Sequence, residues 1–92
     1  MGANDILAMG FGAPEPTLSA EGVRFTVSIE NNLVPCLITH EALLGLARGH
    51  GFHLDAMNTY RAFEAKINSV ARSRVLRGAR DMPLVLEARN FH

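Results

Sequence analysis

The chain has 92 residues, 48% of them apolar, and its nine basic residues balance nine acidic ones. A chain of this length forms one domain with a modest core, so a dimer would be unsurprising. Zero net charge argues against strong nonspecific binding to DNA. The single cysteine excludes an internal disulfide and fits a reducing compartment, so we expect a cytoplasmic protein.

Residues 1–16 differ from the rest of the sequence, because glycine and proline interrupt them and no hydrophobic period is sustained. Their apolar patch, residues 6–9, lacks a basic leader and is too short for a signal peptide or a membrane span. We expect a flexible N-terminal arm over residues 1–16, a single α+β domain over residues 17–92, and no membrane contact.

Residues 23–38 have the pattern of a β-hairpin. Apolar and polar residues alternate from Val23 to Glu30, which is the period of a strand with one buried face. Asn31-Asn32 tolerates the left-handed backbone of a two-residue turn. The pairs predicted by a turn there are all apolar: Ile29–Val34, Val27–Cys36 and Phe25–Ile38.

The opposite face of the second strand carries Leu33, Pro35 and Leu37. Proline has no amide hydrogen to donate, so we expect this strand at a sheet edge, with the last strand beside the first. One layer of helices cannot cover Leu33 and Leu37. Either the N-terminal segment folds over them, or they are exposed as surface leucines often are, or the three residues form a partner surface.

Two helices and a third strand are expected after the hairpin. Thr39 can cap a short helix from His40 to about Arg48. A longer helix is predicted from Asp55, its N-cap, to about Arg77, with Gly78 just past its end. Its predicted core face consists of Met57, Tyr60, Phe63, Ile67, Val70 and Ala71. A strand at about Leu84 to Ala88 completes a two-layer β-β-α-α-β fold, a small antiparallel three-stranded sheet with two helices on one face.

Several of these residues match a known pattern. The run Val23-Arg24-Phe25, followed by Cys36-Leu37-Ile38-Thr39-His40-Glu41-Ala42-Leu43, resembles "V-x-F … C-x-I-[ST]-x-E-A-L". Phe63, Ile67 and Ala71, then Leu84-Val85-Leu86 and Phe91, continue it. The pattern resembles a family of small bacterial proteins described as domain of unknown function 1488. The resemblance implies a bacterial, cytoplasmic protein without an assigned activity.

Four residues are candidate metal ligands: Cys36, His40, His50 and His53. Their C-x3-H…H-x2-H spacing brings together residue types that bind zinc. The hairpin pattern, however, places Cys36 in the core, and a C-x2-C knuckle is missing. The same burial argues against a Cys36–His40 catalytic pair. We expect no metal, no cofactor and no enzymatic activity.

Charge is unevenly distributed along the chain. Residues 1–60 carry two basic and six acidic residues, whereas residues 61–92 carry seven basic and three acidic ones. Basic side chains near a helix end either bind phosphate groups, including those of nucleic acid, or only complement the helix dipole. The candidate contacts are Arg72, Arg74, Arg77 and Arg80. The basic residues of the helix form a dispersed belt: Arg61 and Arg72 share the outward face, Lys66 and Arg77 share a flank, and Arg74 is nearer the core.

Two functional hypotheses remain from the sequence. The first is a non-catalytic protein-interaction or regulatory module, forming a homodimer or docking an unknown partner through Leu33, Pro35 and Leu37. The second is a nucleic-acid or anion binder that uses the arginine-rich end of the second helix.

Overall fold

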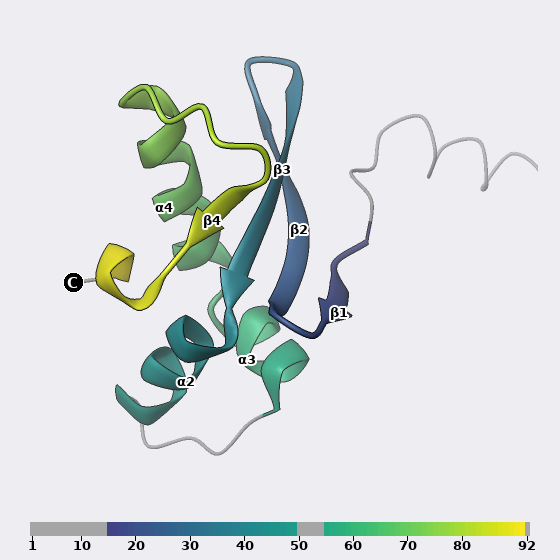
Figure 1. Cartoon of the computed structure of the whole chain (residues 1–92), viewed down its shortest axis with the longest axis vertical. Helices are drawn as coiled ribbons and strands as arrows, with labels where there is room; N and C mark the ends of the chain where they lie inside the picture. Colours follow the sequence, from purple (N-terminus) through teal and green to yellow (C-terminus); the bar gives the residue numbers. More distant parts are fainter. Residues whose placement is uncertain (1–14, 50–54, 92) are drawn as a thin grey trace, which may run out of the picture.

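A computed structural model describes residues 15–49 and 55–91. The chain folds in the order β1 (Thr17–Ser19), β2 (Gly22–Ile29), β3 (Asn32–Thr39), α2 (His40–Gly49), α3 (Ala56–Ala62), α4 (Glu64–Leu76), β4 (Leu84–Leu86) and the 3-10 helix η1 (Ala88–Phe91) (Figure 1). The α+β class is as predicted. Residues 1–14 of the predicted arm, and the candidate ligands His50 and His53, lie outside the described residues.

The sheet has four strands in the order β1-β2-β3-β4, so the predicted three-stranded sheet is wrong in detail. β1 is antiparallel to β2, and β4 is parallel to β3, with Cys36 opposite Leu84 and Ile38 opposite Leu86. The last strand therefore lies beside the second hairpin strand, not the first. The helices between β3 and β4 form the crossover that a parallel pair requires.

The hairpin turns at Glu30-Asn31, one residue earlier than predicted. Both residues have positive φ, 52° and 68°, as a type I′ turn requires. Ile29 therefore pairs with Asn32, and Phe25 pairs with Cys36. The predicted pairing is wrong by two residues, but a shift of two leaves every side chain on its predicted face.

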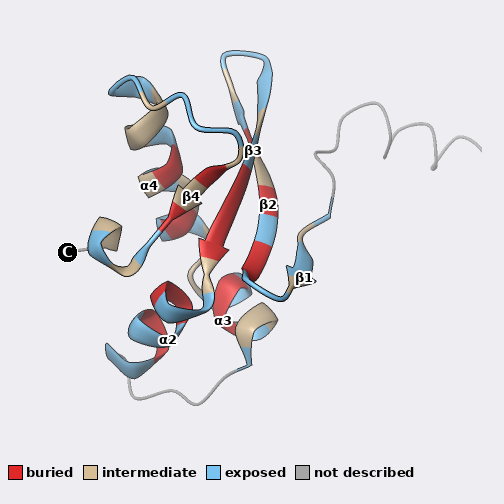
Figure 2. Ribbon diagram, in the orientation of Figure 1, coloured by how far each residue is buried: buried red, intermediate tan, exposed pale blue. Residues whose placement is uncertain are grey.

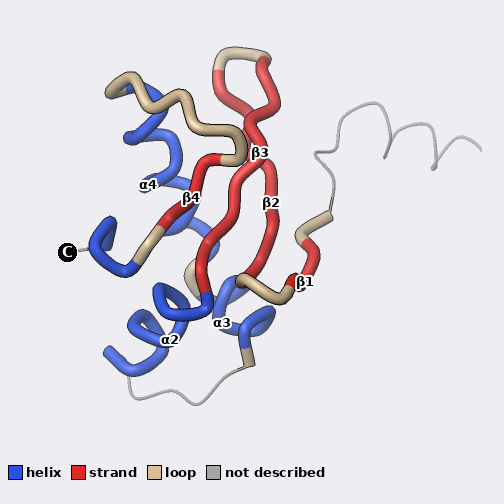
Figure 3. The backbone as a smooth tube through the Cα atoms, viewed as in Figure 1, coloured by secondary structure: helices blue, strands red, loops and turns tan. Residues whose placement is uncertain are grey.

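Pro35 lies in the part of the hairpin that extends beyond β1 and β4. β4 pairs only with residues 36–38 of β3, and β1 pairs only with residues 22–24 of β2. Beyond these points the hairpin continues as a two-stranded ribbon (Figure 3). The prediction of an edge strand is wrong for β3 as a whole, which lies between β2 and β4, although Pro35 itself has no partner on the β4 side.

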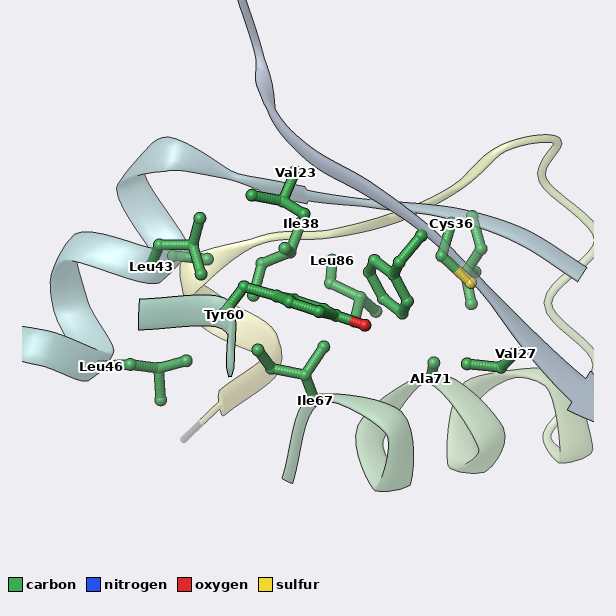
Figure 4. Packing of buried hydrophobic residues seen from close by; sticks show 13 residues of the cluster. Val23, Val27, Cys36, Ile38, Leu43, Leu46, Tyr60, Ile67, Ala71 and Leu86 are labelled. Atoms are coloured by element: carbon green, nitrogen blue, oxygen red, sulfur yellow. The ribbon is translucent and has the colours of Figure 1, made fainter. Parts of the chain in front are cut away.

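The core lies between the sheet and the helices, which cover one of its faces (Figure 2). The Phe25 ring on β2 packs against the Tyr60 ring on α3, with centroids 5.2 Å apart and planes at 45°. Figure 4 shows the Tyr60 side chain among the other buried side chains of this core. The buried cluster is Val23, Phe25, Val27, Cys36, Ile38, Ala42, Leu43, Leu46, Tyr60, Ile67, Ala71, Leu84 and Leu86. Alternation in the strands and helical spacing after Asp55 predict much of this set.

The helix ends follow the predicted caps. Thr39 Oγ1 accepts from the Ala42 amide at 3.1 Å, and Asp55 Oδ1 accepts from the Asn58 amide at 2.8 Å. The predicted single helix from Asp55 to Arg77 is divided at Phe63, where φ is −113° and ψ is 22°. The division lets α3 pack beside α2 and β2 while α4 spans β2 and β4. The described part of the chain therefore has three α-helices, not two.

Candidate anion-binding site

Cys36 is part of the core, as its place in the hairpin predicts. Only 2% of the residue is exposed, and its Sγ donates to the Val34 carbonyl at 3.4 Å. Burial raises the pKa of the thiol to about 11. The thiol is therefore protonated at neutral pH, and a protonated thiol is a poor nucleophile and a poor metal ligand.

His40 lies apart from that buried environment. It begins α2, is exposed, and its Nε2 lies 3.2 Å from the Ser19 carbonyl oxygen. The structure therefore does not present Cys36 and His40 as an accessible catalytic pair. Within residues 15–49 and 55–91, no group of three or more His, Cys, Asp or Glu side chains is placed to hold a metal ion.

The predicted partner surface is only partly exposed. Leu33 is 55% exposed and Pro35 is exposed, but Leu37 is only 6% exposed. Leu37 lies opposite Arg24 on β2 and Val85 on β4, because β3 is flanked on both sides at this level. The expectation that Leu37 belongs to an exposed apolar surface is therefore wrong. Only Leu33 and Pro35 of the predicted partner surface are exposed.

Two of the four candidate arginines fasten α4 to the sheet. Arg74 Nη1 donates to the Val85 carbonyl of β4 at 2.6 Å, and its Nη2 lies 3.8 Å from Asp81 Oδ2. Arg72 Nη2 donates to the Ser28 carbonyl of β2 at 3.4 Å. The two side chains therefore bind strands on opposite sides of β3, and the predicted position of Arg74 near the core is confirmed.

A groove of about 680 Å³ lies between η1 and the C-terminal half of α4 with the turn that follows it. Both elements lie on the β4 side of the molecule in Figure 1. The lining residues are Val70, Ser73, Arg74, Arg77, Gly78, Ala79, Arg89 and Asn90. We call this the basic groove, because three arginines from two separate elements line it.

Local backbone structure shapes both walls of the basic groove. Gly78, with φ of 101°, ends α4: its amide donates to the Val75 carbonyl and the Ala79 amide donates to the Arg74 carbonyl, both at 3.0 Å. This is a Schellman motif, which satisfies the last carbonyls of a helix. On the other wall, Asn90 Oδ1 accepts from the Glu87 amide at 2.7 Å and fixes the turn that carries Arg89.

The basic groove is electropositive, although some of its charges are paired. Arg89 Nη2 lies 3.0 Å from Glu87 Oε1, and Arg74 lies 3.8 Å from Asp81. Within the described residues, no carboxylate lies within ion-pair distance of Arg77 or Arg80. Residues 70–91 contain five arginines and two carboxylates, a net charge of plus three.

A second hollow, of about 600 Å³, lies on the outward face of α4. We call it the outer hollow; its described lining is Ala65, Asn68, Ser69, Arg72, Ser73, Leu76 and Arg77. Ser73 and Arg77 line both the outer hollow and the basic groove. Leu76 is 69% exposed there.

Three of the four predicted arginines line at least one of the two cavities, and Arg89, which was not predicted, lines the basic groove. Arg77 and Arg74 line the basic groove, Arg72 lines the outer hollow, and Arg80 lines neither. Arg89 was missed, because no sequence pattern shows that residues after β4 line the same groove as the C-terminal half of α4. The charge asymmetry, in which Arg89 was counted, was its only signal.

None of the described helices combines the length and the apolar character needed to cross a membrane. Comparison of the chain with models of known protein families, with curated proteins and with solved structures finds no match. The resemblance to domain of unknown function 1488 therefore stays a prediction.

Proposed function

We propose that the protein binds phosphate-bearing anions in the basic groove, without catalysis. The observation that carries this proposal is Arg77, a groove-lining guanidinium with no carboxylate within ion-pair distance in the described chain. A guanidinium offers a planar set of donors that matches two phosphate oxygens at once. Arg77 is therefore the expected anchor of the ligand.

The other groove residues suit the same ligand. Arg74 is held in place by the Val85 carbonyl, so its charge is pre-organised. Arg89 has a side chain 83% exposed and is free to turn from Glu87 towards an anion. Ser73 and Asn90 add a hydroxyl and an amide that can donate to phosphate oxygens.

The end of α4 itself opposes anion binding, because the C-terminal end of a helix has about half a negative charge. Two of the three guanidinium groups in the groove are paired with carboxylates, and the full positive charge of Arg77 outweighs this term. The Schellman hydrogen bonds also occupy the carbonyls of Arg74 and Val75. The electrostatic balance in the groove therefore favours an anion.

Binding without catalysis is proposed because of what lines the groove. Its described lining consists of arginine, serine, asparagine, glycine and apolar residues. It contains no histidine, aspartate, glutamate, lysine, tyrosine or cysteine, the residue types that usually act as general acids or bases. The cytoplasmic location remains part of this proposal.

Titration of the protein with inorganic pyrophosphate, followed by calorimetry or by amide chemical shifts, tests the proposal. We expect shifts at residues 73–79 and 89–90, and Arg77→Gln should weaken binding by about tenfold, the loss of one charged hydrogen-bonding group. The matched control is Arg48→Gln, since Arg48 likewise lies at the C-terminal end of a helix. Equal binding by both variants would contradict the proposal.

A second candidate function is self-association through the hairpin. Leu33 is 55% exposed and Pro35 is exposed, and both lie on the ribbon that extends past β1 and β4. We propose a second copy of the chain as the partner, because a chain of this size gains stability by dimerisation. Sedimentation equilibrium tests it. A dimer that Leu33→Lys dissociates is expected, and a monomeric mass at all concentrations would contradict it.

A further inference from the structure

We propose that the ligand of the basic groove is a strand of single-stranded nucleic acid that crosses the end of α4 into the outer hollow. This inference rests on the proposed anion-binding function and names its ligand. The two cavities share Ser73 and Arg77, so they adjoin at these residues.

The size of the two adjoining cavities exceeds what one phosphate needs. The two cavities measure about 680 and 600 Å³, each in the range of sites that bind whole organic molecules. Arg72 and Arg77 are five residues apart, about 7.5 Å along the helix axis. A ligand that fills both cavities is therefore longer than one phosphate group. We expect it to carry several phosphates in series, with Arg77 at the junction of the two cavities.

The distribution of the arginines favours a single strand over a duplex. Arg72, Arg74 and Arg77 project from different sides of α4, at about 100° per residue, and Arg89 lies on another element. A helix that enters the major groove of duplex DNA presents its contacts on one face. A flexible single strand can instead bend round the end of α4 and meet these residues in turn.

The outer hollow distinguishes nucleic acid from inorganic polyphosphate. Leu76 is 69% exposed in its lining together with Arg72 and Arg77. An exposed leucine beside two guanidiniums suits a ligand with apolar sugar and base faces between its phosphates. Neither cavity has an aromatic side chain in its described lining. Contacts to phosphate therefore dominate, and binding is expected to tolerate any base sequence.

Fluorescence anisotropy with a labelled oligothymidylate of about 12 nucleotides tests this inference. We expect binding to weaken with salt, with a slope of about −3 in a plot of log K against log salt, because four arginines line the two cavities that the strand crosses. Arg77→Gln should weaken both oligothymidylate and pyrophosphate, whereas Arg72→Gln should weaken only the oligothymidylate, by about three- to tenfold. Arg48→Gln is the control for both ligands.

Arg72 also contacts Ser28, so a second variant guards against a folding defect. Leu76→Glu places a carboxylate in the outer hollow at an exposed position and should weaken oligothymidylate binding to the same degree. The strand assignment is overturned if both variants bind oligothymidylate as the native protein does, or if inorganic polyphosphate or a duplex binds more tightly. Pyrophosphate binding that depends on Arg77 would survive that result, whereas its absence would reject the proposed function itself.

Discussion

Arg74 on α4 donates through Nη1 to the backbone carbonyl of Val85, the middle residue of β4, at 2.6 Å. β4 has only three residues, and it is the edge strand of the sheet. An edge strand has backbone groups that another chain can pair with, and native proteins protect such edges. The guanidinium protects this edge, and it holds β4 to the helix layer at the same time.

Replacing Arg74 by methionine keeps much of its packing but removes this bond. We expect the free energy of unfolding to fall by about 1.5–3 kcal/mol, the usual value for a hydrogen bond to a charged group. Arg80→Met is the matched control, because Arg80 is exposed, and it should change stability by less than about 0.5 kcal/mol. Urea denaturation measures both. Equal stability of the two variants would show that the Arg74 bond is dispensable.

Gly22 lies at the start of β2, close to the backbone of β3. Its φ is +155°, and a Cβ there would lie 1.9 Å from the Ile38 carbonyl oxygen. Gly22→Ala should therefore destabilise the protein by more than about 2 kcal/mol. Gly45→Ala should stabilise it by about 0.5–1 kcal/mol, because that position is in a helix and a Cβ meets nothing within 4 Å. Thermal unfolding of both variants checks the contrast, and a stable Gly22→Ala protein would contradict it.

The sequence was sufficient to predict the strand faces and the helix caps, because these depend on local patterns. The hairpin turn was placed one residue late, since Asn31-Asn32 looked the better turn although Glu30 adopts φ of 52°. The core prediction survived this error, because the pairing shifted by two residues and side-chain faces repeat every two.

Features that depend on distant segments could not be predicted. β4 is three residues long, and its sequence does not specify which strand it joins. β1 was missed for the same reason, and the division at Phe63 has no glycine or proline to mark it. The basic groove depends on η1 and the C-terminal half of α4 lining the same cavity, so the position of Arg89 is visible only in three dimensions.

The free energy of unfolding should fall in alkaline solution, because burial disfavours ionisation of the Cys36 thiol and of the Tyr60 hydroxyl. Burial raises the pKa of Cys36 from 9.0 to about 11. Burial, with smaller contributions from the charges of Glu64 and Cys36 and against the lowering effect of Arg61, raises the pKa of Tyr60 from 10.0 to about 12. Above pH 9 the unfolded chain loses these protons first, so the folded state holds more protons and its stability falls as pH rises. The stabilisation is complete below about pH 9 and is lost between pH 9 and 12.

Urea denaturation at a series of pH values measures this loss, which should be on the order of 1–3 kcal/mol for each group. Tyr60→Phe keeps the ring against Phe25, so it should remove the part of the slope between about pH 10 and 12. Cys36→Ala should remove the part that begins at about pH 9. If the two variants retain the native slope, the alkaline transition has another origin.

Glu87 competes with any anion for Arg89, since its Oε1 lies 3.0 Å from Nη2 of that arginine. Glu87→Gln should therefore tighten binding of pyrophosphate in the basic groove. An exposed ion pair is worth at most about 1 kcal/mol, which limits the gain to about fivefold. The backbone amide of Glu87, which donates to Asn90, is retained in the variant.

Glu21→Gln is the control, because Glu21 forms an exposed pair with Arg24 at 3.3 Å on a different part of the chain. Calorimetry should find tighter binding only in the Glu87 variant. An unchanged or weaker affinity there would show that Arg89 does not reach the ligand, and would leave Arg77 and Arg74 as the basic groove's cationic contacts.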